Sequence, residues 1–573
     1  MKYISLFTVL ILTAPLYAQF TGSDTIPSVQ VITIGDIVLP FEHNGNIADA
    51  NYNGVSGGTY LGKSLIFSAG FALSGKYGDS VFANGVNNSS RVTDYVRGMA
   101  GADSNDNRAG IYKITKQDTA FGTSWKMYKY AVELGALYYD GNGDGLYNPV
   151  DLNSNGQWDA NEDRPDFLGD VFTFTVFNDA QIPSRRRFNT VPPLGIEMQQ
   201  YIYAWHIPSD YYKNLIFINY RMVNKGTAAD VIDSAYFSIW SDPDMGNYAN
   251  DFIGSDSLRE GGYVYEGEPD NVWGAQPPAL MYRFLQKPYS YIPGVSYSDV
   301  NSNGLYDEGT DIALDSVIIH YGTLRGTKTV RGAVFTRQNS VTQLMSSHPT
   351  HGDPNTLWEM RNYQIGGRWK TGTPIDVCSW GFGNGTSLAN CAQINPAYFY
   401  SGYPENGTGW LNSGQADQRI MVSAGPFRIE KNKPVDITVA YLVGQGNSAM
   451  GSVAAMREVA DYAHQIYTSN YANFVTDVKD AEAGLPQRFT LQQNYPNPFN
   501  PETNIHYSLT WSGNIKLAVY DILGREVKVL ESGYKGAGSY NLKFNAADIP
   551  SGVYICRLTT EQESAVIKMM YIK

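Results

Sequence analysis

Short runs of alternating apolar and polar residues recur along most of the chain, and they are rich in β-branched and aromatic residues. Such runs predict strands, because successive side chains of a strand point to opposite faces of a sheet. Before residue 484 the runs are Ser64–Phe71, Phe172–Phe177, Gln199–Trp205, Leu215–Val223, Ala235–Trp240, Val317–Tyr321, Val330–Phe335 and Val435–Val443. After residue 484 they are Ile505–Leu509, Ile515–Tyr520, Tyr540–Phe544, Gly552–Leu558 and Ala565–Ile572. The pattern predicts an all-β, multi-domain β-sandwich protein.

Helical periodicity is much rarer, and it predicts one or few helices. In the segment Val453–Tyr467, apolar residues recur at helical spacing and are expected to pack on a core; they are Val453, Met456, Val459, Ala463 and Ile466. Ser452 precedes this stripe and is the expected N-cap. The segment Val475–Leu485 is rich in charged and small residues and predicts a linker.

The first 18 residues have the pattern of a signal peptide. Lys2 is followed by the apolar run Ile4–Leu12 and by a short segment that ends in Ala18. Cleavage after Ala18 would leave Gln19 as the first mature residue, although the bulk of Leu16 leaves the exact site open. No later segment has the roughly 20 apolar residues that a transmembrane helix needs. We therefore expect a signal peptide at 1–18, a β-rich central region of one or more domains at 19–483, a C-terminal domain at 484–573, and no transmembrane segment in the mature chain.

Composition and charge narrow the class of protein. The chain has 42 Tyr and 57 Gly, and only 17% of its residues are charged, which is typical of extracellular β proteins with many turns. The formal net charge is −13, yet the segment from Pro486 onward has nine Lys or Arg and seven Asp or Glu. The negative charge therefore lies in the central region. This argues against nucleic acid as a partner and agrees with bound metal cations.

The last 90 residues contain several motifs in a fixed order. These are Phe489–Pro501, Tyr520–Glu526, Ser551–Tyr554 and Lys568–Lys573. Three prolines exclude Tyr495–Pro501 from a central strand, so an extended or turning strap is expected there. In this order the motifs resemble the type A sorting domain of substrates of the type IX secretion system, the Por secretion system family.

This resemblance implies an Ig-like fold for 484–573 and a function in export. The domain would be recognised by the type IX secretion machinery, and the protein would be secreted or held at the outer cell surface after passing through the periplasm. The residues that carry the motifs are Tyr495, Pro496, Asn497, Pro498, Phe499, Asn500, Pro501, Asp521, Gly524, Arg525, Glu526, Gly552 and Tyr554. Some central segments resemble other proteins with this sorting domain, which implies no activity; they are Phe67–Phe71, Pro193–Ile196, Trp240–Gly246 and Gly425–Phe427.

Three central segments share the pattern D-x-N-x-[DN]-G-x-[YW]-[ND]: Asp140–Asp151, Asp151–Glu162 and Asp299–Asp307. Calcium binds several oxygen ligands, and side chains at alternate positions of a tight loop can all point toward one ion. The Gly at position six permits the sharp turn, and a carboxylate at position twelve can complete the shell. The predicted calcium ligands are Asp140, Asn142, Asp144, Asn148, Asp151, Asn153, Asn155, Asp159, Glu162, Asp299, Asn301, Asn303 and Asp307.

The three loops differ in how their last ligand is supplied. Asp151 would have to serve both as the last ligand of the first loop and as the first ligand of the second. In the third loop position twelve is Thr310, so Asp307, Glu308 or Asp311 would have to substitute. The aromatic residues at position eight, Tyr147, Trp158 and Tyr306, are expected to pack each loop onto the body of the protein.

Pro149 and Pro165 make flanking helices unfavourable, which separates these loops from EF-hands. The loops resemble instead the helix-free calcium loops of dockerin-like or thrombospondin-type repeats, and the expected role of calcium is structural. Ordinary Asx-turns are the alternative, because Asp, Asn and Gly are also common turn formers.

Two further features leave alternatives open. The acidic residues Asp242, Asp244, Asp251 and Asp256 could bind calcium, form a solvated loop, or provide the paired carboxylates of a glycosidase. Cys378 and Cys391 flank a Gly/Asn-rich loop and could form a disulfide, or all three cysteines, including Cys556, could be buried free thiols.

Catalytic signatures are scarce. The sequence has no HExxH, P-loop or CxxC motif, and turn-forming residues around Ser56 in Gly54–Gly58 do not favour a nucleophile elbow. His348, His351 and Asp353 are expected to lie in a polar loop. The sequence therefore favours a secreted or cell-surface structural or adhesive β module stabilised by calcium, whose ligand could be a cell surface or a polysaccharide. A secreted hydrolase that acts on polysaccharide or protein is the alternative.

Overall fold

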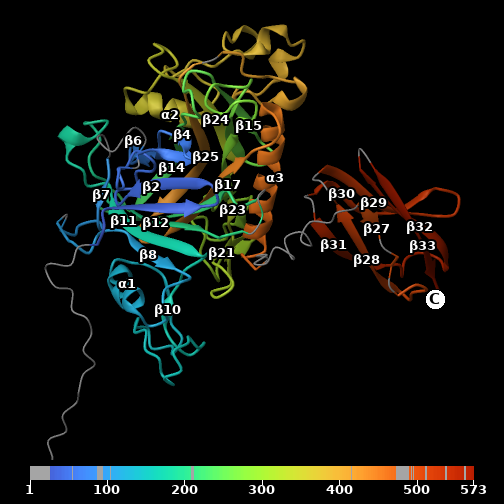
Figure 1. Cartoon of the computed structure of the whole chain (residues 1–573). Helices are drawn as coiled ribbons and strands as arrows, with labels where there is room; N and C mark the ends of the chain where they lie inside the picture. Colours follow the sequence, from blue (N-terminus) through green and yellow to red (C-terminus); the bar gives the residue numbers. More distant parts are fainter. Residues whose placement is uncertain are drawn as a thin grey trace, which may run out of the picture.

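The computed structural model describes residues 26–472 and 489–572, except for residues 55, 87–93, 104, 208, 210–211, 415, 492, 495, 510–512, 536–537 and 561–562. The expected signal peptide, the first mature residue Gln19, the linker Val475–Leu485 and the motif residue Tyr495 lie outside the described residues. Antiparallel sheets dominate the described part of the chain (Figure 1). The protein is all-β with a multi-domain β-sandwich architecture, as the alternating pattern predicts.

Within the described residues, nine strands form what we call the large sheet. Their order is β15-β16-β17-β26-β13-β12-β11-β7, and β8 also pairs with β11. In chain order, the strands are β7 Val96–Arg97, β8 Tyr112–Thr115, β11 Val171–Asn178, β12 Ile196–Ala204, β13 Leu215–Asn224, β15 Asp251–Asp256, β16 Gly261–Glu266, β17 Ala279–Gln286 and β26 Val435–Gly444.

A second sheet, which we call the small sheet, packs on one face of the large sheet. Its order is β24-β25-β14-β5-β6. Tyr220 of the large sheet contacts Phe71 and Phe237 of the small sheet, with ring centroids 5.5 and 5.3 Å apart, and all three side chains belong to one buried core. The strands are β5 Ser68–Tyr77, β6 Ser80–Val86, β14 Val231–Asp242, β24 Gln338–Met345 and β25 Gln418–Glu430.

The opposite face of the large sheet is covered by helix α1 (Thr123–Glu133) and helix α3 (Ala449–Thr468). The predicted apolar stripe of α3 lies in a second buried core with alternate residues of the sheet, which confirms the expected packing. β26, for example, places Ile437 and Val439 in the first core and Ala440 and Leu442 in the second. Strands of the large sheet are therefore buried on both faces. Helix α2 (Leu357–Ile365) and α1 lacked a clear helical pattern in the sequence.

Ser448, and not Ser452, is the N-cap of α3. The Ser448 hydroxyl accepts a hydrogen bond from the Gly451 amide at 3.0 Å. Ser452 lies inside the first turn, where its hydroxyl donates to the Ser448 carbonyl at 3.1 Å. The sequence prediction placed the cap one turn late, because Gly451 interrupts the apolar periodicity at the start of the helix.

The substitution Ser448→Ala should lower the free energy of unfolding by about 1 kcal/mol, because it leaves an amide of the first turn without its acceptor. Ser448→Asn retains a capping oxygen and should remain near wild-type stability. Chemical denaturation measures both variants. Equal losses in the two variants would contradict the capping role.

The remaining central elements are short. Strands β1–β4 form a separate meander, and the others form two-stranded ribbons. They are β1 Val29–Ile34, β2 Ile37–Glu42, β3 Gly58–Tyr60, β4 Lys63–Ile66, β9 Tyr138–Tyr139, β10 Arg164–Pro165, β18 Tyr289–Ser290, β19 Tyr297–Ser298, β20 Ile312–Ala313, β21 Ser316–His320, β22 Thr327–Arg331 and β23 Val334–Phe335. The short 3-10 helices are η1 Pro183–Arg185, η2 Val377–Ser379, η3 Asn384–Ser387, η4 Cys391–Gln393 and η5 Pro404–Asn406.

The structure pairs two of the three cysteines. A disulfide joins Cys378 of η2 to Cys391 of η4, with an S–S distance of 2.04 Å. Cys556 is a buried free thiol, and burial raises its pKa to about 12. Of the two alternatives that the sequence left open, the structure shows the disulfide and not three free thiols.

The C-terminal strands form two sheets of their own around a separate core. One sheet has the order β27-β28-β31 and the other β30-β29-β32-β33. The sequence pattern missed β30, because this edge strand is largely exposed and shows no alternation of buried and exposed residues. The strands are β27 Thr490–Leu491, β28 Glu502–Leu509, β29 Gly513–Tyr520, β30 Glu526–Lys535, β31 Gly538–Asn545, β32 Gly552–Thr560 and β33 Ser564–Tyr571.

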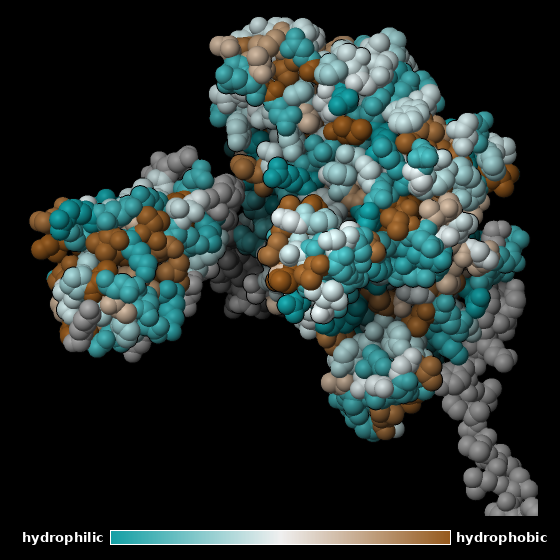
Figure 2. Space-filling model, turned by 180° about the vertical axis from the view of Figure 1, so that it is seen from behind, coloured by the Kyte–Doolittle hydropathy of each residue, from teal (hydrophilic) through white to brown (hydrophobic). Residues whose placement is uncertain are grey.

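The surface shows no broad apolar face in the view of Figure 2. Apolar side chains of the main body are scattered singly or in small groups among polar residues there. No helix in the described residues is both long and apolar enough to cross a membrane.

Candidate metal-binding loops

The three repeated segments, which we call loops 1, 2 and 3, are all held by two-residue ribbons. Loops 1 and 2 connect β9 to β10, where Tyr139 pairs with Arg164. Loop 3 connects β19 to β20, where Tyr297 pairs with Ala313. Figure 1 shows loops 1 and 2 projecting from the body beyond α1 and β10.

In each loop, the side chains at positions one and three converge on one backbone amide, that of position five. In loop 2, Asp151 Oδ1 and Asn153 Oδ1 accept from the Asn155 amide at 3.1 and 3.0 Å. The corresponding distances are 3.2 and 2.9 Å in loop 1, and both are 3.2 Å in loop 3. The predicted ligands at these positions are therefore brought together in all three loops; they are Asp140 and Asn142, Asp151 and Asn153, and Asp299 and Asn301.

The side chain at position five also accepts a hydrogen bond from a backbone amide of its own loop. The side-chain oxygens of Asp144, Asn155 and Asn303 each accept from the amide of position seven, at 2.8, 2.7 and 2.8 Å. The turn at position six is made by a glycine of positive φ in each loop. The repeat therefore folds each segment in the same way.

Position nine also faces the inside of the loop. In loop 2, Asp159 Oδ2 accepts from the amide groups of Asn153 and Asn155 at 2.8 and 2.9 Å. In loop 3, Asp307 Oδ2 does the same with Asn301 and Asn303, at 2.8 and 2.7 Å. Loop 1 has Asn148 there, and its Oδ1 is buried without a hydrogen-bond partner. An orphaned buried oxygen is a ligand atom that a cation can satisfy.

A buried carboxylate closes each loop by bridging the amides of positions two and nine. In loop 2 this residue is Glu162, whose oxygens accept from Leu152 and Asp159 at 2.7 and 2.9 Å. In loop 3 it is Asp311, which accepts from Val300 and Asp307, both at 2.8 Å. Of the three substitutes that the sequence left open for this loop, the structure selects Asp311.

Loop 1 is closed by Asp163, a residue that sequence reasoning missed. Its oxygens accept from Gly141 and Asn148 at 3.0 and 2.7 Å, and its side chain is buried. Asp151 does not close loop 1, because its carboxylate is bound to the amides of Asn155 and Gly156 within loop 2. The two closing aspartates share one feature that could have identified Asp163. Each directly precedes the second strand of its ribbon, Asp163 before β10 and Asp311 before β20.

Three carboxylates thus line or close each loop, and none of them has a neutralising side chain among the described residues. They are Asp140, Asp144 and Asp163 in loop 1, Asp151, Asp159 and Glu162 in loop 2, and Asp299, Asp307 and Asp311 in loop 3. No Lys or Arg among the described residues forms an ion pair with any of these nine. Like charges held within one tight loop repel one another, so this arrangement calls for a cation.

The aromatic residues at position eight anchor the loops, as predicted. Tyr147 is buried and donates to the Trp125 carbonyl at 2.8 Å. The Trp158 indole donates to the Glu162 carbonyl at 2.9 Å. The Tyr306 ring stacks on Tyr291, with centroids 5.3 Å apart. Position eight therefore holds loops 1 and 3 to residues outside them, and in loop 2 the Trp158 ring packs on Tyr139 of β9, with centroids 5.6 Å apart.

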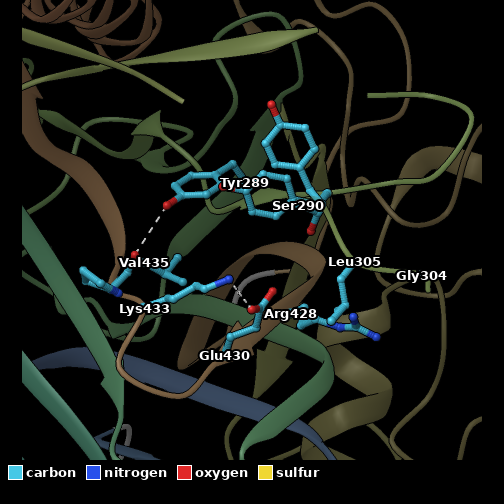
Figure 3. Close-up of a pocket in the computed structure, with 11 residues that line it drawn as sticks. Tyr289, Ser290, Gly304, Leu305, Arg428, Glu430, Lys433 and Val435 are labelled. Atoms are coloured by element: carbon cyan, nitrogen blue, oxygen red, sulfur yellow. Dashed lines mark hydrogen bonds and ion pairs between the residues drawn. The ribbon is translucent and has the colours of Figure 1, made fainter. Parts of the chain in front are cut away.

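Loop 3 also borders a small pocket (Figure 3). Gly304, Leu305 and Tyr306 of loop 3 line it together with Arg428, Glu430 and Lys433, among others. The pocket has a volume of about 40 Å³. Small-molecule sites are typically about 300–1,000 Å³, so this pocket is too small for a sugar chain or a peptide.

Oxygen donors in this number suit a hard cation such as calcium, which accepts carboxylate, amide and carbonyl oxygens in an irregular shell. Positions one, three, five and nine would supply side-chain ligands. The closing carboxylate holds the two ends of the loop together and is positioned to contribute an oxygen.

Neutralising a closing carboxylate should weaken calcium binding by about 10–100-fold at its own loop. Asp163→Asn should affect loop 1, Glu162→Gln loop 2, and Asp311→Asn loop 3. The matched control is Asp315→Asn, an exposed acid four residues beyond Asp311. Calorimetric titration with calcium measures each variant. Unchanged binding in all three closing variants would contradict the assignment.

The sorting motifs occupy the surface and the edge of the C-terminal sandwich. The strap Pro496–Pro501 runs beside β33: Asn497 Oδ1 accepts from the Met570 amide at 2.7 Å, and the Phe499 amide donates to the Met570 carbonyl at 2.9 Å. Phe499 is 2% exposed and anchors the strap in the core. The strap is not a ladder strand, as its prolines predict.

The other motif residues form turns of the same domain. Asp521 accepts from the Arg525 amide at 3.0 Å and forms an ion pair with its guanidinium at 2.7 Å, around Gly524 at φ +78°. Glu526 pairs with Lys516 at 2.7 Å. Gly552 begins β32, and the Tyr554 hydroxyl donates to the Pro550 carbonyl at 2.7 Å.

The surroundings of Ser56, His351 and Asp353 do not favour catalysis. Ser56 is followed by strand β3 and not by the helix of a nucleophile elbow. The polar loop expected around His351 is wrong for that residue, because His351 is fully buried among aromatic rings, including Trp380 and Phe399, and burial lowers its pKa to about 3. Asp353 pairs with Arg419 at 3.6 Å.

Residues 493–573 match the family model of the secretion system C-terminal sorting domain. The C-terminal sandwich is therefore a sorting domain of the type IX secretion system, and the protein is exported to the outer surface or the medium. No curated protein matches the chain. A solved structure of a polysaccharide lyase matches at 7% identity with a TM-score of 0.17, over 66% of this chain and 34% of its own length. The chain thus spans about a third of that structure, and this likeness carries no argument about fold or activity.

Proposed function

We propose that the central region is a calcium-stabilised structural or adhesive β module that the C-terminal sorting domain delivers to the cell surface or the medium. The observation that carries the proposal is the common construction of the three loops. In each loop the side-chain oxygens converge and a buried carboxylate closes the loop. Among the described residues, no Lys or Arg neutralises these carboxylates.

The expected role of calcium is to protect these loops outside the cell. Calcium is abundant outside the cell, and long loops of a secreted protein are exposed to proteases. An ion that links both ends of a loop removes conformations from which cleavage occurs. Loops 1 and 2 project from the body, so they gain most from this protection.

Fractionation of a producing bacterium tests both parts of the proposal. Wild-type protein should be found intact outside the cell in millimolar calcium, and deletion of residues 493–573 should leave the chain inside the cell envelope. The combined variant Asp163→Asn, Glu162→Gln and Asp311→Asn should be exported but cut within the loops.

The outcomes separate the two claims. Normal export without residues 493–573 would contradict the role of the C-terminal domain in export. An exported triple variant that survives proteases as well as wild type would contradict the calcium role.

A further inference from the structure

A second group of acids lies where strands of the two central sheets end. Asp242 is the last residue of β14, Asp244 follows it, and Asp417 directly precedes β25. One carboxylate oxygen from each lies within 4.8 Å of the others. Calcium–oxygen distances are about 2.3–2.6 Å, so ligands on opposite sides of one ion are separated by up to roughly 5 Å. The spacing fits a single ion.

Two more carboxylates lie behind this group. Asp251 begins β15 and Glu266 ends β16, and the register places them directly opposite each other. They are 0% and 1% exposed. Like charges in opposed positions destabilise a pair of strands. The sheet therefore brings two buried carboxyl groups together at this point.

Several oxygens of the group are orphaned. Asp242 Oδ1, Asp251 Oδ1 and Glu266 Oε1 are buried and have no hydrogen-bond partner among the described residues. Asp242 itself is only 5% exposed. A buried carboxylate oxygen without a partner costs free energy, and a bound cation would remove that cost.

One guanidinium, that of Arg419, lies beside the group. Arg419 pairs with Asp242 at 3.1 Å and with Asp417 at 3.3 Å. In the described part of the chain, no Lys or Arg forms an ion pair with Asp244, Asp251 or Glu266. Arg419 also pairs with Asp353 at 3.6 Å, so its one positive charge is shared with a carboxylate outside the group of five.

The electrostatics agree with this count. Burial raises the pKa of Asp242 to about 7 against the opposing effect of Arg419, and burial raises the pKa of Asp244 to about 6. Burial and the neighbouring Glu266, Asp244 and Asp242 raise the pKa of Asp251. A bound divalent cation would favour the ionised form of these carboxyl groups, which burial disfavours.

We propose that Asp242, Asp244 and Asp417 bind one divalent cation, with calcium as the expected ion and the unpartnered Oδ1 of Asp251 behind them. The site is separate from loops 1–3 and does not rest on the proposed function. It would fasten the end of β14 to the start of the neighbouring strand β25 in the small sheet.

The number of calcium ions bound per chain tests this site. Equilibrium dialysis of the full mature protein against millimolar calcium, followed by elemental analysis, should give one ion fewer for Asp244→Asn with Asp417→Asn than for wild type. Asp230→Asn with Asp233→Asn removes two acids from the exposed ion pairs with Lys431 and Arg428, and should leave the number unchanged. The triple loop variant should keep this ion. An undiminished number in the Asp244/Asp417 variant would overturn the proposal.

A second measurement covers the case in which the variant fails to fold. Crystals of wild-type protein soaked in manganese, which binds oxygen ligands and scatters anomalously, should show a peak between Asp242, Asp244 and Asp417. Absence of that peak at millimolar manganese would overturn the proposal, whatever the loops bind.

Discussion

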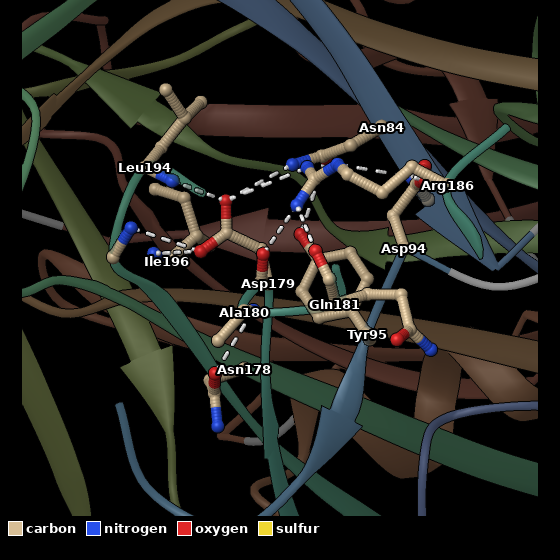
Figure 4. Close-up of polar contacts among 12 residues, drawn as sticks. Asn84, Asp94, Tyr95, Asn178, Asp179, Ala180, Gln181, Arg186, Leu194 and Ile196 are labelled. Carbon is tan, nitrogen blue, oxygen red and sulfur yellow. Dashed lines mark hydrogen bonds and ion pairs between the residues drawn. The ribbon is translucent and has the colours of Figure 1, made fainter. Parts of the chain in front are cut away.

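The substitution Asp179→Ala should lower the free energy of unfolding by about 3–5 kcal/mol, the range for breaking a buried ion pair from one side. Asp179 is 1% exposed, and its carboxylate accepts from the amides of Leu194, Gly195 and Ile196 at 2.7–2.9 Å (Figure 4). The fully buried Arg186 guanidinium lies 4.0 Å away. The substitution leaves three amides without their acceptor and removes one of the two carboxylates beside the guanidinium, the other being Asp94 at 3.9 Å.

Urea unfolding of the whole chain measures this loss, and two variants calibrate it. Asp179→Asn keeps one acceptor oxygen and should lose less than Asp179→Ala. Asp233→Ala breaks the exposed pair with Arg428 and should cost no more than about 1 kcal/mol. If Asp179→Ala unfolded no more easily than Asp233→Ala, the network would not be the buried support described here.

Removal of calcium should have the second large effect. Each occupied loop adds about 1.4 kcal/mol when free calcium is ten times its dissociation constant, and about 2.7 kcal/mol at a hundred times. Three loops together should therefore stabilise the protein by about 4 kcal/mol or more. Thermal unfolding with EDTA should begin several degrees lower than with millimolar calcium.

The triple closing variant is the matched control for this measurement. It should unfold at nearly the same temperature in calcium and in EDTA, except for any contribution from Asp242, Asp244 and Asp417. A full calcium shift in the triple variant would show that the stabilisation comes from elsewhere.

Much of the sandwich could be predicted because its strands are rich in β-branched and aromatic residues. Leu215–Val223 and Val435–Val443 match β13 and β26 to within a residue at each end. The covering of the large sheet on both faces could not be predicted from its strands, because a strand that is buried on both faces has no polar side to distinguish one face from the other. α1 buries Trp125 and Tyr128 but interleaves them with lysines, which hid its helical pattern.

The candidate loops could also be predicted only in part. Their first nine positions are local, so the repeat in the sequence indicated which oxygens converge. Closure depends on tertiary structure: Asp163 reaches loop 1 across the whole of loop 2, to an amide 22 residues away. Gly141 permits this approach, because a side chain there would meet the backbone of Glu162 at 2.3–2.6 Å.

The buried network around Asp179 also depends on pairing that no local pattern contains. The segment Pro193–Ile196 stood out only by its resemblance to other exported proteins. Its role is to present three successive amides to one carboxylate from the end of the neighbouring strand β11. A sequence alone does not show which acid would accept them.

The most direct test of the central claim is anomalous diffraction from crystals grown in millimolar calcium, at a wavelength where calcium scatters strongly. The account predicts one peak in each loop, about 2.3–2.6 Å from the side-chain oxygens of positions one, three and five. Loops that keep their hydrogen bonds but show no anomalous peak would be ordinary turns, and that result would contradict the calcium-stabilised module.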